Sequence, residues 1–367
     1  MAKPFDKTHI FIAGAGPVGL TAAIELARLG FNPRIIDPNL SVVPESRALA
    51  INARTLDLME PSGVTEMLLG AGIRIKKLVI RRDRKVLARI DLSLIPHRFN
   101  FMLVLAQSKT EEILAAKLAE MGVKLERGLG LESFRPEAPL NLNLSDGSIA
   151  KADYLIGADG AHSIVRKTLG LGFAGETDTQ VFGLADVTLN DWPFGLDAVV
   201  LTILDTHLAP FVPMGEGYGR FISTIGDCLN NLPSDAKVGK VMWETDFKIS
   251  YRQASTYQQG NVFLVGDAAH IHSPVGGRGM NLGMEDACWL AWLIAEGRGD
   301  DYTTLRHPIG ADVLKLTHSF TAFAKSRGVV PDILIRTLLP VVAALPFAQR
   351  KILHMLSALD TPPAPWL

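Results

Sequence analysis

The sequence predicts an α/β fold, in which an open parallel sheet is interrupted by a mainly antiparallel β-sheet and followed by C-terminal helices. Residues 9–37 show a strand–helix–strand pattern, and parallel strands need such a crossover helix. Residues 173–257 change to short alternating runs separated by Gly, Pro and Asp, which is typical of an antiparallel sheet. At 261–296 a buried strand and a helix return, so we expect the first sheet to resume after this insert.

The opening elements follow from three local patterns. Residues 9–13 are a short apolar run before a glycine-rich turn, which predicts a strand. Residues 18–29 have helical spacing, and Gly30 ends the expected helix. Residues 33–37 predict the second strand of the parallel sheet.

The later elements are expected on the same grounds. Apolar residues share one helical face at 108–122, and a strand at 123–125 follows. Within the insert, residues 198–204 and 220–224 alternate as strands do. After the buried strand of the resumed sheet, helical spacing returns at 284–296.

Composition excludes several classes of protein. The length of 367 residues leaves room for two or three lobes. A formal net charge of -1 gives no basic field, so we expect no nucleic-acid partner. Cys228 and Cys288 show neither close pairing nor metal-ligand spacing, and no secretory signal pattern is present, so a reducing, cytoplasmic setting fits. The oligomeric state stays open.

An apolar segment at 329–347 needs separate treatment because a membrane span requires about 20 uninterrupted apolar residues. The segment is interrupted by Pro331, Asp332, Arg336, Pro340 and Pro346. We therefore do not expect it to span a membrane. Packing within the chain, or on a partner or membrane surface, both stay open.

The first motif with a chemical meaning is Gly14-Ala15-Gly16-Pro17-Val18-Gly19, between the first strand and helix. Gly14 permits a tight turn, Gly16 lets the backbone approach a pyrophosphate, and Gly19 lets helix and strand pack closely. Asp37, followed by Pro38, ends the second strand, where a carboxylate can accept both hydroxyls of an adenosine ribose. The pattern predicts a Rossmann-like dinucleotide site, without distinguishing NAD from FAD.

Two further motifs resolve this ambiguity by resemblance. One runs from Asp153 to Arg166 around Gly157-Ala158-Asp159-Gly160; the other runs from Gly260 to Ala287 and contains Gly266-Asp267-Ala268-Ala269-His270 and Gly276-Gly277-Arg278-Gly279-Met280-Asn281. With the first motif, they resemble the three fingerprints of FAD-dependent aromatic hydroxylases, the para-hydroxybenzoate hydroxylase-like group A flavoprotein monooxygenases. The resemblance spans about residue 8 to about residue 310.

The resemblance implies residue roles at the cofactor. Asp267 would contact the flavin ribityl chain, and the turn at 279–281 would present backbone N–H groups to the isoalloxazine. Gln107 would also contact the ribityl chain, unless it is only a polar residue at a helix start. The implied cofactor-binding set is Gly14, Ala15, Gly16, Pro17, Val18, Gly19, Asp37, Pro38, Arg47, Gln107, Leu131, Asp159, Gly266, Asp267, Gly279, Met280 and Asn281.

Several assignments in these motifs leave alternatives open or rest on a weaker match. Arg47 matches an arginine near the FAD phosphates, but a surface ion pair would also explain it. Asp159 would serve both FAD and the nicotinamide nucleotide, or orient the pyrophosphate loop. Leu131 is a weaker match, to backbone near the adenine. For Arg166, at the end of the second motif, a role at the cofactor and a structural ion pair both stay open.

The resemblance also implies a reaction. NADPH or NADH would reduce FAD, O2 would add to give a C4a-hydroperoxide, and its distal oxygen would hydroxylate an aromatic or polyketide-like small molecule. The choice between NADH and NADPH stays open. One alternative is a flavin-dependent epoxidase, Baeyer–Villiger oxygenase or oxidase on the same scaffold. A second is a non-redox FAD-binding protein.

The substrate side is weakly determined, because no catalytic acid or base can be matched to a position of this sequence. Tyr251 lies in the insert and is a further candidate for the pocket wall. His270 and His272 form a close pair that supplies too few ligands, so we expect no metal. The pocket candidates are Pro274, Val275, Gly276, Tyr218, Arg220 and His207.

We expect the following division of the chain. Residues 1–172 form the first part of the FAD-binding domain, with a possible excursion into the substrate domain near 73–106. Residues 173–257 form the β-rich substrate domain. Residues 258–310 resume the FAD-binding domain, and 311–367 form a C-terminal helical segment.

Overall fold

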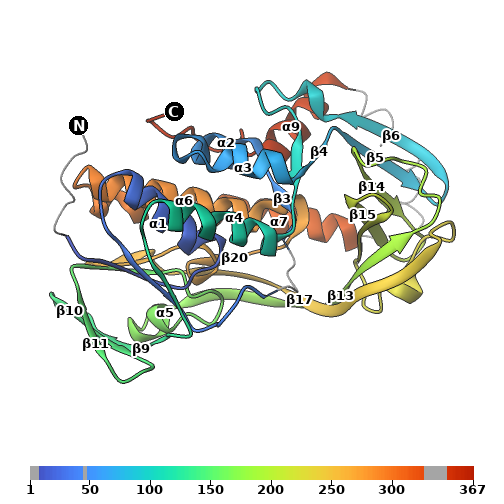
Figure 1. Ribbon diagram of the computed structural model, residues 1–367. Helices are drawn as coiled ribbons and strands as arrows, with labels where there is room; N and C mark the ends of the chain where they lie inside the picture. Colours follow the sequence, from blue (N-terminus) through green and yellow to red (C-terminus); the bar gives the residue numbers. More distant parts are fainter. Residues whose placement is uncertain (1–7, 44–47, 326–344) are drawn as a thin grey trace.

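The strands in the described part of the chain form two large and two small sheets (Figure 1). The computed structural model describes residues 8–43, 48–325 and 345–367. Within them, the large sheets contain six and eight strands, and the small sheets contain three strands each. This mixture of parallel and antiparallel sheets with C-terminal helices confirms the predicted fold class.

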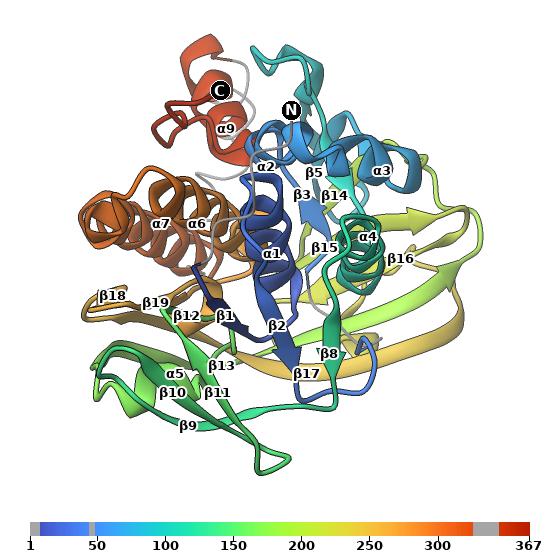
Figure 2. The ribbon, with the colours of Figure 1, turned by 60° about the vertical axis from the view of Figure 1, so that its left-hand side comes forward.

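The six-stranded sheet is parallel except for its edge strand β18. Helices α1 (Pro17–Arg28), α4 (Gln107–Glu120) and α6 (Arg278–Ala295) lie on one face, and a small sheet of β11, β10 and β9 lies on the other (Figure 2). In spatial order the six strands are β18 (Gln258–Gln259), β19 (Val262–Leu264), β12 (Tyr154–Gly157), β1 (Ile10–Ala13), β2 (Arg34–Asp37) and β8 (Leu125–Arg127).

The eight-stranded sheet is antiparallel except where β5 pairs with β14. Two of its strands, β13 and β17, contain 17 residues each and extend across both halves of the molecule (Figure 1). In spatial order the strands are β20 (His270–Ile271), β17 (Val238–Ala254), β13 (Phe173–Leu189), β16 (Tyr218–Ser223), β15 (Leu208–Gly215), β14 (Ala198–Ile203), β5 (Lys77–Arg82) and β6 (Lys85–Asp91).

The remaining elements connect or cover these sheets. The small sheets are β3 (Ala50–Ile51), β7 (Met102–Val104) and β4 (Ile73–Ile75), and β11 (Ile149–Ala152), β10 (Leu140–Leu144) and β9 (Leu131–Arg135). The other α-helices among the described residues are α2 (Ala53–Met59), α3 (Val64–Ala71), α5 (Ile164–Thr168), α7 (Tyr302–Lys325) and α9 (Pro346–Ser357). Short 3-10 turns at Gly266–Ala268 and Val275–Gly277 precede α6.

Several element boundaries differ from the predictions by a few residues, and glycines explain two of them. The strand expected at 123–125 lies at Leu125–Arg127, because Gly122, with a φ of 80°, and the residues after it form the turn that ends α4. The helix expected from 284 begins at Arg278. Glycines discourage a helix assignment from sequence, but here Gly283 lets α6 pack directly on Gly266, whose Cα lies 2.9 Å from where a Cβ of Gly283 would be.

The main core lies between the six-stranded sheet and its helices. Strand β1 is buried along its whole length, and Leu20 and Ile24 of α1 are buried against it. At the end of the chain Trp366 stacks on Trp292 and meets Trp289 edge-on. These contacts hold the C-terminal segment against α6.

The domain boundaries stay a prediction. Pairing of β5 with β14 in the eight-stranded sheet supports the expected excursion near 73–106. Of the apolar segment at 329–347, residues 329–344 lie outside the described residues. In the described part of the chain, no helix has both the length and the apolarity needed to cross a membrane.

Candidate cofactor site

The first glycine turn is closely packed on one side and open on the other. Gly14 has a φ of 104°, and a Cβ there would lie 2.3 Å from the carbonyl oxygen of Ala158. A Cβ on Gly19 would lie 2.0 Å from the carbonyl oxygen of Gly14. Gly16, the N-cap of α1, has no atom within 4 Å of its Cβ position. The turn therefore leaves space at the start of α1, where free N–H groups and the helix dipole favour an anion such as a pyrophosphate.

Asp37 at the end of β2 fixes this turn. Its Oδ2 accepts a hydrogen bond of 2.7 Å from the Ala15 N–H, and its Oδ1 accepts one of 2.8 Å from the Asn39 N–H. The Leu129 N–H donates to the Asp37 carbonyl at 3.1 Å. Because each carboxylate oxygen has two lone pairs, Asp37 can still accept ribose hydroxyls. The adjacent Pro38 lies against Gly130, which directly precedes Leu131 at the start of β9.

The second motif packs onto the first and third. Asp159 Oδ2 accepts the N–H groups of Ile164 at 2.7 Å and Val165 at 3.1 Å, so this carboxylate caps α5. Asp159 Oδ1 is buried and has no partner among the described residues. Arg166 donates to the carbonyls of Ala268 at 2.9 Å and Ala161 at 2.8 Å. The guanidinium of Arg166 thus joins the second motif to the third through backbone carbonyls rather than through the ion pair named as its structural alternative.

Burial and an aromatic ring complete the setting of Arg166. Its guanidinium lies 3.7 Å from the centroid of the Phe173 ring, and burial lowers the pKa of the side chain. A cation over a ring face in a dry environment is a strong contact. We conclude that Arg166 fixes the relative positions of two turns, which is consistent with a positioning role at the site.

The third motif forms the start of α6. Gly276 and Gly277 have φ values of 78° and 65°, and a Cβ on Gly277 would lie 2.7 Å from the Cβ of Ala50. The exposed Asp267 lies in the preceding 3-10 turn. Gly279 and Met280, in the first turn of α6, are half-buried. Their backbone N–H groups lie at the positive end of an 18-residue helix.

Asn281 joins the third motif to α2. Its side-chain Nδ2 donates to the carbonyls of Ala50 at 2.7 Å and Gly277 at 2.6 Å, and its Oδ1 accepts the Asn52 N–H at 3.0 Å. Asn52 in turn is the N-cap of α2. The side chain of Asn281 therefore supports the turn from which α6 begins.

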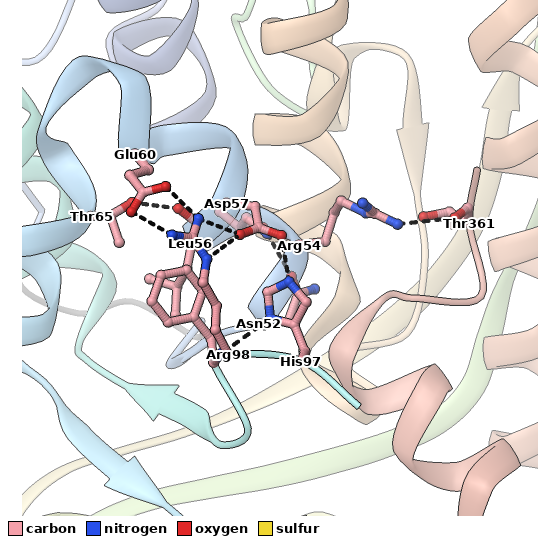
Figure 3. Close-up of polar contacts among 11 residues, drawn as sticks. Asn52, Arg54, Leu56, Asp57, Glu60, Thr65, His97, Arg98 and Thr361 are labelled. Carbon is pink, nitrogen blue, oxygen red and sulfur yellow. Dashed lines mark hydrogen bonds and ion pairs between the residues drawn. The ribbon is translucent and has the colours of Figure 1, made fainter. Parts of the chain in front are cut away.

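Helix α2 is also tied to two segments distant in sequence (Figure 3). Asp57 accepts hydrogen bonds from His97 Nε2 at 2.6 Å and from Arg98 Nη2 at 2.7 Å. Arg54 Nη2 donates to the Thr361 carbonyl at 3.3 Å. The segment before β7 and the loop after α9 thus both fix the helix whose start contacts the third motif.

A buried charged cluster lies beneath the third motif. His270 Nε2 donates to Asp286 at 2.6 Å, and Arg306 donates to Asp286 at 2.7 Å and to Glu285 at 2.8 Å. The His272 ring stacks on that of His270, and burial lowers the pKa of His272 to about 3. The pair of histidines is thus engaged with a carboxylate and a backbone carbonyl at Ser273.

Gln107 opens α4, and its Nε2 donates to Glu111 at 2.9 Å. Leu131 is buried at the start of β9. Arg47 lies outside the described residues, as does the side chain of Val275. Pro274 is exposed and Gly276 half-buried in the turn before α6.

The insert candidates have partners of their own. Arg220 makes two hydrogen bonds to Asp186, at 2.6 Å and 2.8 Å, across the β13–β16 pair. His207 Nε2 donates to the Asn231 carbonyl at 2.7 Å, and this histidine is buried. Burial, with a smaller effect of Asp186, raises the pKa of Tyr218. Arg220 and His207 are therefore explained as structural residues, while Tyr218 stays a candidate for the pocket.

Sequence reasoning missed Asp186, Glu111 and Asn52. Asp186 had a detectable signal, because it is an acidic residue within the apolar run of β13. Glu111 lies one helical turn after Gln107, which is a spacing that brings side chains together. Asn52 is a standard N-cap residue, but its contact with Asn281 joins positions too distant for any local pattern.

The motifs that the sequence identified converge in space. Gly14 contacts Ala158, Arg166 contacts Ala268, and Gly266 lies against Val18. This cradle has no room for added Cβ atoms at Gly14, Gly19 and Gly277, and it is open at Gly16, so its residues fit a dinucleotide lying across the starts of α1 and α6.

Comparisons with known proteins identify the family. An FAD binding domain family model matches residues 7–218 and 226–317. The chain is 34% identical to a 6-methylpretetramide 4-monooxygenase of Streptomyces rimosus over 98% of this chain and 70% of that protein. It is 32% identical to a pentachlorophenol 4-monooxygenase of Sphingobium chlorophenolicum over 87% of this chain and 65% of that protein.

A solved structure agrees in fold. The crystal structure of a p-nitrophenol 4-monooxygenase from Pseudomonas putida DLL-E4 superposes with a TM-score of 0.86, covering 97% of this chain and 99% of the other at 19% identity. At 19% sequence identity, this similarity shows a shared fold only. The family model and the curated relatives, however, rest on sequence along nearly the whole chain. The chain therefore belongs to the FAD-dependent monooxygenases of the aromatic-hydroxylase family.

Proposed function

We propose that the protein uses NADPH or NADH and O2 to hydroxylate an aromatic or polyketide-like small molecule at a bound FAD. The observation that carries the proposal is the convergence of three glycine-and-aspartate turns at the starts of α1 and α6. The relatives described above, a pentachlorophenol 4-monooxygenase and a 6-methylpretetramide 4-monooxygenase, support an aromatic or polyketide-like substrate.

The residues would hold FAD from end to end. Asp37 would accept the adenosine ribose hydroxyls, and the open start of α1 at Gly16 would hold the pyrophosphate. Gln107 and Asp267 would contact the ribityl chain, and the first turn of α6 would face the isoalloxazine. When bound, FAD supplies the redox chemistry by which electrons from the nicotinamide activate O2.

The chain's own contribution is positioning and electrostatics. The N-terminus of α6 would stabilise negative charge on a bound isoalloxazine through its free N–H groups and dipole. The turn at 274–277 would border the substrate. Tyr218 lies on β16, which pairs with the strand β13 that contains Asp186. It is our candidate for a side chain whose phenol group contacts the substrate from the wall formed by the eight-stranded sheet.

Purified protein tests the proposal directly. We expect FAD to copurify, and an electron-rich phenol or polycyclic phenol to accelerate NAD(P)H oxidation with matching O2 uptake. The product should carry one added oxygen on a ring carbon. Oxygen inserted beside a carbonyl would favour a Baeyer–Villiger reaction, an oxirane would favour an epoxidase, and loss of two hydrogens would favour an oxidase. FAD that NAD(P)H never reduces, with or without substrate, would favour a non-redox role.

A cytoplasmic location is also proposed. It is supported by the two buried free cysteines, Cys228 and Cys288. Fractionation of the source cells with an antibody would test it, because protein found in the extracellular or membrane fraction would contradict it.

A further inference from the structure

Gln107 is held by a buried carboxylate rather than by solvent. Its Nε2 donates to Glu111 Oε1 at 2.9 Å, and Glu111 is only 9% exposed. A carboxylate can only accept hydrogen bonds when ionised, so the NH2 end of the Gln107 amide must face it. The carbonyl end, Oε1, is then the end that remains to accept a hydrogen bond from elsewhere.

Glu111 lies among the residues of the adenosine end of the site. Burial is the main factor that raises its pKa, and the negative charge of Asp37 raises it further, while Gln107 and Arg127 lower it. Arg127 is the register partner of Asp37 across β2 and β8. A carboxylate buried next to a second carboxylate is costly, so its retention at this position requires an explanation.

An ordinary helix-surface pair does not explain it. Lys109 and Glu112 on the same helix form such a pair at 2.9 Å, and their side chains are 55% and 56% exposed. Exposed ion pairs of that kind contribute little to the stability of a protein. Glu111 has a neutral amide as its hydrogen-bond partner, it is buried, and its carboxylate interacts electrostatically with Asp37 of the predicted cofactor site.

We infer that Glu111 is a positioning residue for the cofactor: it holds the Gln107 amide with its carbonyl oxygen presented as an acceptor for a hydroxyl of the ribityl chain. This inference rests on the proposed FAD site, in which Gln107 contacts that chain. The chemistry it requires of the ligand is a hydroxylated chain that donates hydrogen bonds, as ribityl does. A free amide would flip between donor and acceptor, and part of the binding free energy would be spent on fixing it.

The first test is a double-mutant cycle on the affinity of the apoprotein for FAD, measured by flavin fluorescence. Gln107→Ala and Glu111→Ala should each weaken binding by roughly 3- to 10-fold, the size of one hydrogen bond. If Glu111 acts through Gln107, the double variant binds FAD no more weakly than Gln107→Ala alone. Glu112→Ala, on the exposed side of the same helix, is the matched control and should leave the affinity unchanged.

The second test exchanges the two groups. Gln107→Glu alone places two acceptors against each other and should weaken FAD binding by at least about tenfold. Adding Glu111→Gln restores a donor facing an acceptor, so the exchanged pair should return to within about threefold of the original affinity. Rescue by this swap is not expected from a residue that merely stabilises α4.

The outcomes separate the two claims. Additive losses in the cycle, or no rescue by the exchange, would overturn the positioning role of Glu111. Normal FAD affinity of Gln107→Ala would also overturn it, while protein that still oxidises NAD(P)H leaves the proposed function intact. Wild-type protein that takes up no FAD would instead refute the proposed function itself.

Discussion

Substituting His272 by asparagine should reduce the pH dependence of the protein's stability. His272 Nδ1 donates to the Ser273 carbonyl at 3.1 Å, and its Nε2 is buried without a partner among the described residues. Asparagine has no titrating group, and its Nδ2 can replace the Nδ1 donor. The histidine ring also lies near Gly279 in the first turn of α6, since the Cβ position of Gly279 is 3.7 Å from His272 Cε1. The substitution therefore tests the packing directly against the start of α6.

The magnitude follows from linkage. Burial lowers the pKa of His272 to about 3 in the folded protein, so the ring stays neutral there. In the unfolded chain a histidine has a pKa of about 6.5 and takes up a proton as the pH falls below that value. The unfolded state therefore binds more protons, and stability falls with decreasing pH. From about pH 7.5 to about pH 5, this one group should cost about 2 kcal/mol.

Urea denaturation of the FAD-loaded protein at several pH values measures the effect. The free energy of unfolding of the wild type should fall about 2 kcal/mol further across that interval than that of His272→Asn. Exposed His162, in the second motif, provides a matched control, and His162→Asn should follow the wild-type curve. If the free energy of unfolding fell equally with pH in the wild type and in His272→Asn, the His272 ring would take up a proton in the folded state as it does in the unfolded state. The reasoning from burial would then be refuted.

Two further predictions concern the glycine turn and the insert. Gly16→Ala should fold normally, because nothing lies within 4 Å of the new Cβ, yet it should bind FAD at least about tenfold more weakly, whereas Gly19→Ala should destabilise the apoprotein itself. Apoprotein melting and FAD titration would separate the two, and equal behaviour would contradict the assignment of the open side to the pyrophosphate. Asp186→Ala should cost roughly 3–5 kcal/mol because it leaves the buried charge of Arg220 without its carboxylate, and Asp186→Leu with Arg220→Met should recover much of that stability. A urea denaturation series would show this, and a loss in Asp186→Ala below about 1 kcal/mol would mean that the pair is solvated.

The turns were predictable from sequence because their requirements are local. Gly14 and Gly277 adopt positive φ values that favour glycine, and each is adjacent in sequence to the strand or helix it connects. The same holds for Asp37, which ends strand β2 and accepts a hydrogen bond from Ala15 in the glycine turn. The parallel order of the strands followed from the crossover rule once those turns were located.

The buried charge partners were not predictable, because strand register and helix packing bring them together. Asp186 and Arg220 are 34 residues apart and meet only because β13 and β16 pair in one register. Asn281 meets Asn52 across 229 residues. No periodicity in the chain encodes such contacts, whereas a single acidic residue in an apolar strand does indicate that some partner must exist.

The long β13–β17 ribbon limits how the two halves of the molecule can move. A rotation of the eight-stranded sheet against the six-stranded lobe would have to bend both strands along their length, since neither is interrupted by a loop. Their pairing shifts register between Thr177 and Val181, between Asp186 and Val187, and between Val187 and Leu189, and each shift interrupts the hydrogen-bond ladder. Any opening that admits a bulky ring system should therefore bend the ribbon at these irregular positions, while the regularly paired stretches between them stay straight.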